Sequence, residues 1–301
     1  MIEGMEPALS KPVAEPDCAS RTCRRLVLAT SGERPDIAAE AQRLLPRVAE
    51  HAQVELVDLA EGRDLAQMEF DVAVVLGGDG SILRAAHQMA RHQRPVIGVN
   101  LGKLGFLADF SPAEFLSLLP NICSGSLAVV EHLMYECQLL RHGQLVQQQL
   151  GLNEVAVFAG APFSIVEVQL YVDAELVTTY SCDGLIVSTP IGSTAHNLSA
   201  GGPILRQDLH AFVISPISPH TLTNRPVVDS ADRVYELVVT EPHPGTSVVT
   251  DGRMLGKLEP GDRVRIERSA ARFQLVAVPG HSYYRTLREK LGWGGRMQGG
   301  R

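Results

Sequence analysis

The stretch DVAVVLGGDGSILRAAHQMARH, residues 71–92, constrains the fold more than any other part of the chain. Its first six residues are nearly all apolar, which predicts a buried strand, and apolar residues recur at helical spacing from Ile82 onward. Three glycines surround Asp79 between these two patterns. A buried strand that turns directly into a helix is typical of a β–α unit, in which helices cover a parallel sheet.

The alternation of strand and helix extends over the first 125 residues. Further segments have such patterns, namely strands at 25–30, 54–59 and 95–100 and a helix at 37–48. Ser111 and Pro112 have the residue types of an N-cap and a first helical residue, so another helix is expected there. The pattern predicts a doubly wound α/β domain over residues 24–125. Residues 1–23 carry three prolines and little periodicity, which predicts a disordered tail.

After about residue 125, strand follows strand. Over 166–173, Val and Leu alternate with polar residues and Tyr, which is the period of a half-buried strand. Similar segments follow, broken by Pro and Gly turns: GLIVSTP, AFVISPI, RVYELVV, TSVVTDG, DRVRIERS and RFQLVAV. They predict an all-β sandwich domain over 126–280. The pattern at 282–293 is helical, and we expect residues 281–301 to dock as a helix on the first domain.

The composition narrows the class of protein and its location. The chain has 45% hydrophobic and 20% charged residues, which is typical of a soluble globular protein. Its formal net charge of −7 argues against a nucleic-acid binder. No apolar run approaches the roughly 18 residues of a membrane span, and no apolar region typical of a secretory signal is present at the start. Five scattered cysteines fit reduced thiols, so we expect a cytoplasmic protein without a membrane partner.

The glycine-rich turn predicts a phosphate loop made of Gly77, Gly78, Gly80 and Ser81. Backbone N–H groups without neighbouring Cβ atoms approach a phosphate closely, and the positive end of a helix dipole favours an anion. The turn is not a Walker loop, because no Lys-Ser/Thr pair follows, and it lacks the G-x-G-x-x-G spacing of dinucleotide-binding turns. Asp79 within it could hold Mg²⁺ or accept a proton from an attacking hydroxyl. The alternative is a turn aspartate that caps the following helix.

GGDGS after a strand resembles the signature of a kinase superfamily that includes NAD kinases, diacylglycerol and sphingosine kinases, and 6-phosphofructokinases. More specific segments are similar to bacterial NAD kinases, in order from about residue 25 to 296: GVNLGKLGFLADF, LNEVAV, CDGLIVSTPIGSTAHNLSAGGPIL, SPISPHTLTNRPVV and YYRTLREKLGWGGR. The resemblance implies transfer of a phosphoryl group from ATP, or from polyphosphate, to the 2′-hydroxyl of the adenosine ribose of NAD. It also implies a divalent cation, Mg²⁺, for which no side-chain ligand is assigned.

The resemblance also implies roles for individual residues. Asp79 is the expected catalytic base. The expected NAD-binding residues are Gly80, Arg84, Asn153, Glu154, Asp183, Thr194, Ala195, His196, Asn197, Leu198 and Ser199. In some family members the residue matching Asp183 acts across a subunit interface, which implies a homodimer or homotetramer.

Each of these roles has a structural alternative. Asn153 and Glu154 could be an exposed strand-end pair, Asp183 a turn residue, Arg84 a solvated helix residue and the 194–199 segment a capped helix without a ligand. For two further residues the resemblance implies a contact with the ligand, but the structural alternative is favoured: the core for Phe106 and a hairpin turn for Asp251. The chain also departs from the family at Ile191, where a hydroxyl residue is usual, and at His196, where a tyrosine stacks on a ligand base.

Two other functions are compatible with parts of the sequence. A diacylglycerol-type lipid kinase shares GGDG, but it predicts an apolar groove for acyl chains and no STPIGSTA segment. A non-catalytic dinucleotide-binding sensor would keep the binding residues without turnover.

Overall fold

The computed structural model describes residues 25–30, 34–60, 64–102, 105–160, 165–221 and 223–293. The tail predicted at 1–23 lies outside these residues. Within the described ranges, no helix combines the length and the apolar composition that crossing a membrane requires.

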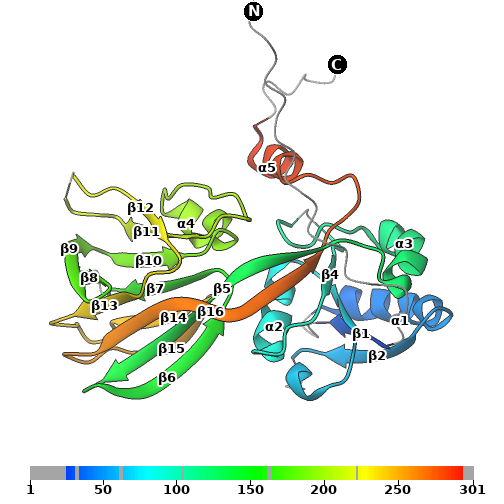
Figure 1. Cartoon of the computed structure of the whole chain (residues 1–301), viewed down its shortest axis with the longest axis horizontal. Coiled ribbons are helices and arrows are strands. Elements are labelled where there is room, and N and C mark those ends of the chain that lie inside the picture. The colour runs from blue at the N-terminus through cyan, green and yellow to red at the C-terminus, as the bar shows by residue number, and fades with distance from the viewer. Residues whose placement is uncertain are drawn as a thin grey trace, which may run out of the picture.

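The first half of the chain contains a parallel sheet with the strand order β2-β1-β3-β4. Strands β1, β2 and β4 are labelled in Figure 1, together with helices α1, α2 and α3. The strands are β1 (Arg25–Thr30), β2 (Gln53–Asp58), β3 (Val72–Leu76) and β4 (Val96–Val99). The helical elements of this half are α1 (Pro35–Ala49), the short 3-10 helix η1 (Leu65–Gln67), α2 (Asp79–Met89) and α3 (Pro112–Ser124).

The strands of this half are buried on both faces. Val27 and Val75 belong to the same apolar cluster as Ile82 of α2. Leu28 belongs to a second cluster with Phe115 of α3. Helices therefore cover both faces, which confirms the predicted doubly wound fold. The direction of winding reverses between β1 and β3, and ligands bind beside such a reversal at the carboxyl ends of the strands.

Helix α2 begins at Asp79, earlier than its apolar periodicity indicates. Gly78 is its N-cap, with extended backbone angles, and the helix ends where Ala90 adopts a φ of +47°. The first three helical residues carry no apolar signal, so the pattern could show the helix only from Ile82. The start of α3 is confirmed, because Ser111 and Glu114 form a capping box.

The second half consists of two packed sheets (Figure 1). One sheet has the order β12-β11-β10-β7-β14-β15. Its strands are β7 (Glu154–Phe158), β10 (Gly184–Ser188), β11 (Ala211–Ile217), β12 (Val227–Ser230), β14 (Ser247–Thr250) and β15 (Arg253–Lys257). The strands that face it are β5 (Val129–Arg141), β6 (Gln144–Gly151), β8 (Val166–Val172), β9 (Glu175–Cys182), β13 (Tyr235–Val239) and β16 (Arg263–Val276).

Strand β16 joins the two halves into one sheet. The sequence predicted separate strands at 262–269 and 272–278, and this was wrong. Between them lie Ala270 and Ala271, with no Gly or Pro to end a strand, and a register shift against β5 between Arg268 and Arg272 absorbs the irregularity. At its far end, Leu275 pairs in parallel with Val96 of β4. The β5–β16 ribbon therefore runs from the sandwich into the α/β half (Figure 1).

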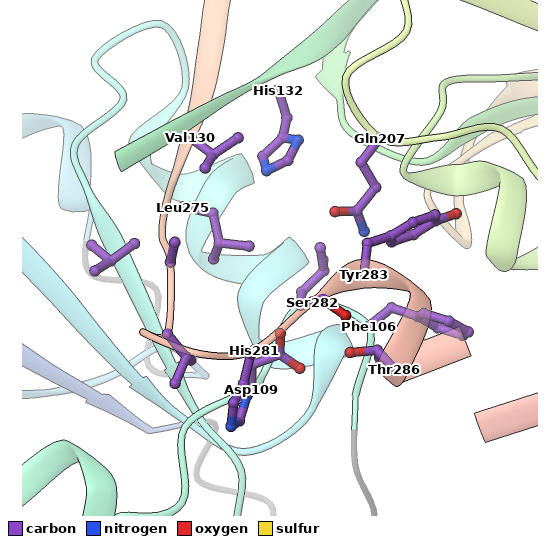
Figure 2. Close-up of a pocket in the computed structure, with 14 residues that line it drawn as sticks. Phe106, Asp109, Val130, His132, Gln207, Leu275, His281, Ser282, Tyr283 and Thr286 are labelled. Carbon is purple, nitrogen blue, oxygen red and sulfur yellow. The ribbon is translucent and has the colours of Figure 1, made fainter. Parts of the chain in front are cut away.

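Helix α5 (Tyr283–Leu291) contacts both halves. The Tyr283 hydroxyl donates to the carbonyl of Leu205 at 2.9 Å, and the Lys290 ammonium lies 4.5 Å from the centre of the Phe106 ring. A cavity of about 170 Å³ lies beneath the start of α5. Asp109 and His281 lie at one end of it, and His132 of β5 lies at the other (Figure 2).

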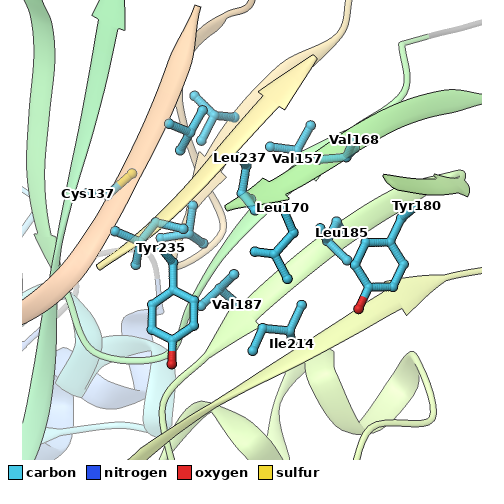
Figure 3. Close-up of a cluster of buried hydrophobic side chains, with 14 of the residues drawn as sticks. Cys137, Val157, Val168, Leu170, Tyr180, Leu185, Val187, Ile214, Tyr235 and Leu237 are labelled. Carbon is cyan, nitrogen blue, oxygen red and sulfur yellow. The ribbon is translucent and has the colours of Figure 1, made fainter. Parts of the chain in front are cut away.

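The core of the sandwich is apolar and draws on both sheets. Val168 and Leu237 project from the large sheet, while Val157, Leu185 and Ile214 project from the other (Figure 3). All five side chains are buried. This packing confirms the predicted sandwich, with the difference that one of its sheets continues into the first half.

Candidate active site

The glycine-rich turn lies at the carboxyl end of β3. Gly77 has a φ of +136°, which favours glycine, and its N–H donates to the carbonyl of Val99 at 2.9 Å. Gly78 and Gly80 are exposed, and a Cβ atom at either position would meet nothing within 4 Å. Ser81 is half-buried in the first turn of α2. The backbone at the start of α2 is therefore open to a ligand.

Asp79 is held by a loop from another part of the chain. Its carboxylate accepts hydrogen bonds from the backbone N–H groups of Phe106, Leu107 and Ala108, at 2.8, 3.0 and 3.2 Å. Gly105 allows this approach, because a Cβ atom there would collide with the carboxylate. Asp79 is thus not the N-cap of α2, and the three donors fix its orientation. Its Oδ2 atom accepts only one of these bonds, so it retains capacity for another.

Asn153 and Glu154 lie at the start of β7, and the structure separates their environments. Asn153 is half-buried, whereas Glu154 is 7% exposed and its Oε2 atom has no hydrogen-bond partner. Burial, together with the charge of Asp251, raises the pKa of Glu154 to about 8, although a hydrogen bond from the backbone of His196 opposes the shift. An exposed strand-end pair is therefore wrong for Glu154, and its raised pKa favours the protonated form.

The segment that includes η2 (Gly192–Thr194) and α4 (His196–Ser199) packs beside this pair. The N–H of Thr189 donates to the Asn153 carbonyl at 2.9 Å. The His196 ring stacks on Phe158, with ring centres 5.5 Å apart and an angle of 22° between their planes. Ala195, Thr194 and Leu198 are half-buried and Ser199 is exposed. The structure therefore brings most of this predicted segment together with Asn153 and Glu154.

Asn197 differs from its neighbours because its side chain is fully buried and its hydrogen bonds are internal. Its amide donates to the carbonyls of Ser193 and Pro203, both at 3.0 Å, and its Oδ1 atom accepts from the Ser215 hydroxyl at 2.7 Å. The side chain holds the segment in place and is not available to a ligand in this structure. Ile191 likewise faces the core, in the same cluster as Ile82 of α2.

Within one copy of the chain, Asp183 and Glu154 are far apart. Along the antiparallel pair of β10 and β7, Ser188 faces Glu154 and Gly184 faces Phe158. Asp183 precedes β10 and is five residues from Ser188. At about 3.3 Å per residue, Asp183 lies roughly 16 Å from Glu154 along the strand direction. Its side chain is 52% exposed and lies 3.3 Å from Nε2 of His220. Arg84 is half-buried on α2.

Asp109 follows the loop that surrounds Asp79. Its Oδ1 atom is buried without a hydrogen-bond partner. Burial raises the pKa of Asp109 to about 6, with His281 lowering it and the charge of Asp79 raising it further. Among the described residues, no group of three or more His, Cys, Asp or Glu side chains could hold a metal ion.

Both halves of the chain match family models. Residues 30–127 match the ATP-NAD kinase N-terminal domain, and residues 152–278 match the ATP-NAD kinase C-terminal domain. The chain belongs to the NAD kinase family. It is 52% identical over 273 residues to an NAD kinase of Rhodopirellula baltica, covering 91% of this chain and 88% of the relative. An NAD kinase of Colwellia psychrerythraea is 38% identical, over 80% of this chain and 86% of the relative.

Solved structures of NAD kinases have the same fold. An NAD kinase from Archaeoglobus fulgidus in complex with ATP aligns with a TM-score of 0.72 at 29% identity, covering 89% of this chain and 98% of the other. Yeast NADH kinase complexed with NADH aligns with a TM-score of 0.81 at 20% identity, covering 94% and 91% of the two chains. These likenesses confirm the fold, while the family models and the relatives confirm the family that the sequence motifs indicated.

Sequence reasoning missed two parts of this site. The loop that binds Asp79 lies within the GVNLGKLGFLADF motif, but its contact with Asp79 could not be predicted, because the contact is made by backbone N–H groups. Asp251 does lie at the predicted hairpin turn, with a φ of +45°, but its carboxylate is buried beneath the Asn153–Glu154 pair. Because Asp-Gly turns are common in hairpins, the sequence favoured a turn for Asp251 and did not predict its buried hydrogen bonds.

Proposed function

We propose that this NAD kinase transfers the terminal phosphoryl group of ATP to the 2′-hydroxyl of the adenosine ribose of NAD, at a site shared by Asp79 and the Asn153–Glu154 pair. One observation carries the assignment of these residues to one site. Helix α2 begins at Asp79, and His87 on the same helix bonds to the Asp251 carboxylate that also binds the N–H groups of Asn153 and Glu154.

Asp79 is the proposed general base. A fixed carboxylate at the N-terminus of a helix that borders a phosphate loop is suited to accept the proton of an attacking hydroxyl. The three N–H bonds to its oxygens support this role, because they orient the carboxylate before the substrate arrives. Gly77, Gly78, Gly80 and Ser81 would hold the donor phosphates, with Arg84 as a further phosphate ligand.

The NAD adenosine is proposed to lie against Asn153, Glu154 and the 194–199 segment. A protonated Glu154 donates a hydrogen bond, whereas a carboxylate only accepts. At pH 7 this residue would therefore donate to a ribose oxygen or a base nitrogen, while the Asn153 amide can both donate and accept. His196 offers the ring face that does not pack on Phe158 to a ligand base.

A divalent cation, Mg²⁺, is proposed to enter with the donor rather than to occupy a protein-built centre. The described residues provide no cluster of ligands for it, and Mg²⁺ is commonly held by substrate phosphates with few protein ligands. When bound, such an ion neutralises phosphate charge.

Assembly and location complete the proposal. Asp183 is exposed and lies apart from Glu154, so we propose that it serves the site of a second copy in a cytoplasmic homodimer or homotetramer. Neither the diacylglycerol-type lipid kinase nor the non-catalytic sensor has support among the relatives found.

The test is an assay of NADP formation with ATP and polyphosphate as donors and with NAD and NADH as acceptors, each pair in turn. ATP with NAD should form NADP. Absence of NADP from NAD and of NADPH from NADH with either donor, in protein that binds NAD in calorimetry, would contradict the proposed function and favour the sensor.

A further inference from the structure

The Asp251 carboxylate is the most heavily hydrogen-bonded side chain near the proposed site. Its side chain has 0% exposure. Oδ1 accepts from the N–H groups of Asn153 and Glu154, at 2.8 and 3.0 Å, and from the Tyr135 hydroxyl at 2.8 Å. Oδ2 accepts from the N–H of Leu152 at 2.7 Å and lies 2.7 Å from Nε2 of His87.

These partners come from different parts of the fold. Residues 152–154 lead into β7, Tyr135 belongs to β5, and His87 belongs to the last turn of α2. His87 follows Asp79 by eight positions, which is about 12 Å along a helix. The His87–Asp251 contact therefore ties the helix that begins at Asp79 to the strand that begins at Glu154.

Both side chains of this contact are buried, so it depends on the position of a single ring nitrogen of His87. The His87 side chain is 8% exposed, and its Nδ1 atom has no hydrogen-bond partner in the structure. Only Nε2 makes the link. If His87 were removed, Asp251 would keep the backbone donors at 152–154 and the Tyr135 hydroxyl, so the sandwich would keep its turn. Helix α2 would lose its hydrogen bond to Asp251 and keep only its apolar packing against Leu152 and Ile191.

We propose that His87 and Asp251 are positioning residues for phosphoryl transfer, holding Asp79 in register with an NAD molecule bound by the Asn153–Glu154 pair. The proposal rests on the proposed function. Neither residue touches the substrate in it, and both act through the elements that they join. Because Asn153, Glu154 and the 194–199 segment lie on the β7 side of this link, its loss should leave NAD binding in place. Misplacement of a catalytic group by about 1 Å costs on the order of 10²-fold in rate, so the loss should appear in kcat.

The test compares substitutions at His87 that differ in whether the new side chain can bond to the Asp251 carboxylate. A Gln amide nitrogen occupies the position of Nε2, whereas an Asn amide nitrogen occupies the position of Nδ1. We expect His87→Leu and His87→Asn to lower kcat for NADP formation at least tenfold, with the KM for NAD within about twofold of wild type. We expect His87→Gln to recover most of kcat. His92→Leu, at an exposed histidine just beyond α2, is the matched control and should behave as wild type.

Thermal denaturation establishes which variants are folded at the assay temperature. If the His87→Leu variant does not fold, the comparison of His87→Asn with His87→Gln tests the proposal, because both substitutions place a polar amide in the buried position. Equal kcat for these two variants, or a folded His87→Leu protein with wild-type kcat, would overturn the proposal, and so would a loss confined to KM. Wild-type NADP formation in the same assay tests the proposed function separately from the variant ratios.

Discussion

The α-carbon of Gly192 lies against the backbone carbonyl of Asn153, too close for any Cβ atom to fit between them. This contact places the 194–199 segment beside the Asn153–Glu154 pair. The carbonyl it approaches also accepts hydrogen bonds from the Thr189 N–H and the Ser188 hydroxyl, at 2.9 and 3.2 Å. The carbonyl is thus fixed from several sides and cannot move away to make room for a side chain.

Gly192→Ala should therefore destabilise the protein and weaken NAD binding together. The added methyl group has to displace either the segment or the start of β7, and overpacking of a rigid site costs about 1–3 kcal/mol. Thermal denaturation and NAD calorimetry measure the two effects. Gly102→Ala is the control for stability, because a Cβ atom there meets nothing within 4 Å. Equal effects of the two substitutions would contradict the close contact.

Asp79→Asn should reduce kcat at least about 10²-fold and leave NAD affinity nearly unchanged. The substitution removes the proton acceptor and points an amide group at the N–H donors of residues 106–108. Steady-state rates of NADP formation and NAD calorimetry check the two halves of this prediction. A mutant with near wild-type kcat would rule out the general-base role.

His196→Ala should raise the KM for NAD roughly tenfold, with a smaller effect on kcat. Stacking of a ring on a base contributes about 1–3 kcal/mol, by analogy with nucleic-acid binding. His196→Tyr, which restores the residue usual in the family, should keep activity, because a larger ring can still pack on Phe158. An unchanged KM in the alanine variant would show that residue 196 does not contact the ligand.

The Glu154→Gln variant should gain stability relative to wild type as the pH rises. The pKa of Glu154 is about 8 in the folded protein and lower in the unfolded chain. Stability from this group is fully present below the unfolded pKa and is lost as the pH rises through about 8, because only the folded state then retains the proton. Glutamine does not titrate. The difference in Tm between variant and wild type should grow from pH 5 to 8 and level off above; a constant difference would refute the assignment.

The Asp109→Asn variant should also gain stability relative to wild type as the pH rises, but over a narrower pH range. With a folded pKa of about 6, the stability from protonated Asp109 is lost between about pH 4 and 6. The variant's Tm relative to wild type should therefore rise across that range and stay level from pH 7 to 8. The two carboxyl groups can be told apart by the pH at which each difference stops growing.

The sequence predicts this fold well where local pattern carries the information. The change from strand to helix at Gly77 and the Ser111 cap were both readable, because each depends on neighbours in the chain. The continuity of β16 could not be predicted, because it depends on pairing with β5 and β4, which are distant in the sequence. In the site, motifs indicated Asp79 and Glu154, but the burial of Asp251 and the internal bonds of Asn197 arise only when distant segments pack together.

The β5–β16 ribbon has a consequence for autonomous folding. The two regions that match separate family models share a sheet, so neither contains all the strands that it needs. Expressed alone, residues 30–127 would lack β16 and nearly all of β1, which would leave β4 with an unpaired edge and separate β2 from β3. An open edge of apolar parallel sheet is prone to aggregate. Because the ribbon is shared, any rotation of one half relative to the other would twist it. The interruption of the ladder between Arg268 and Arg272 is where such torsion meets least resistance.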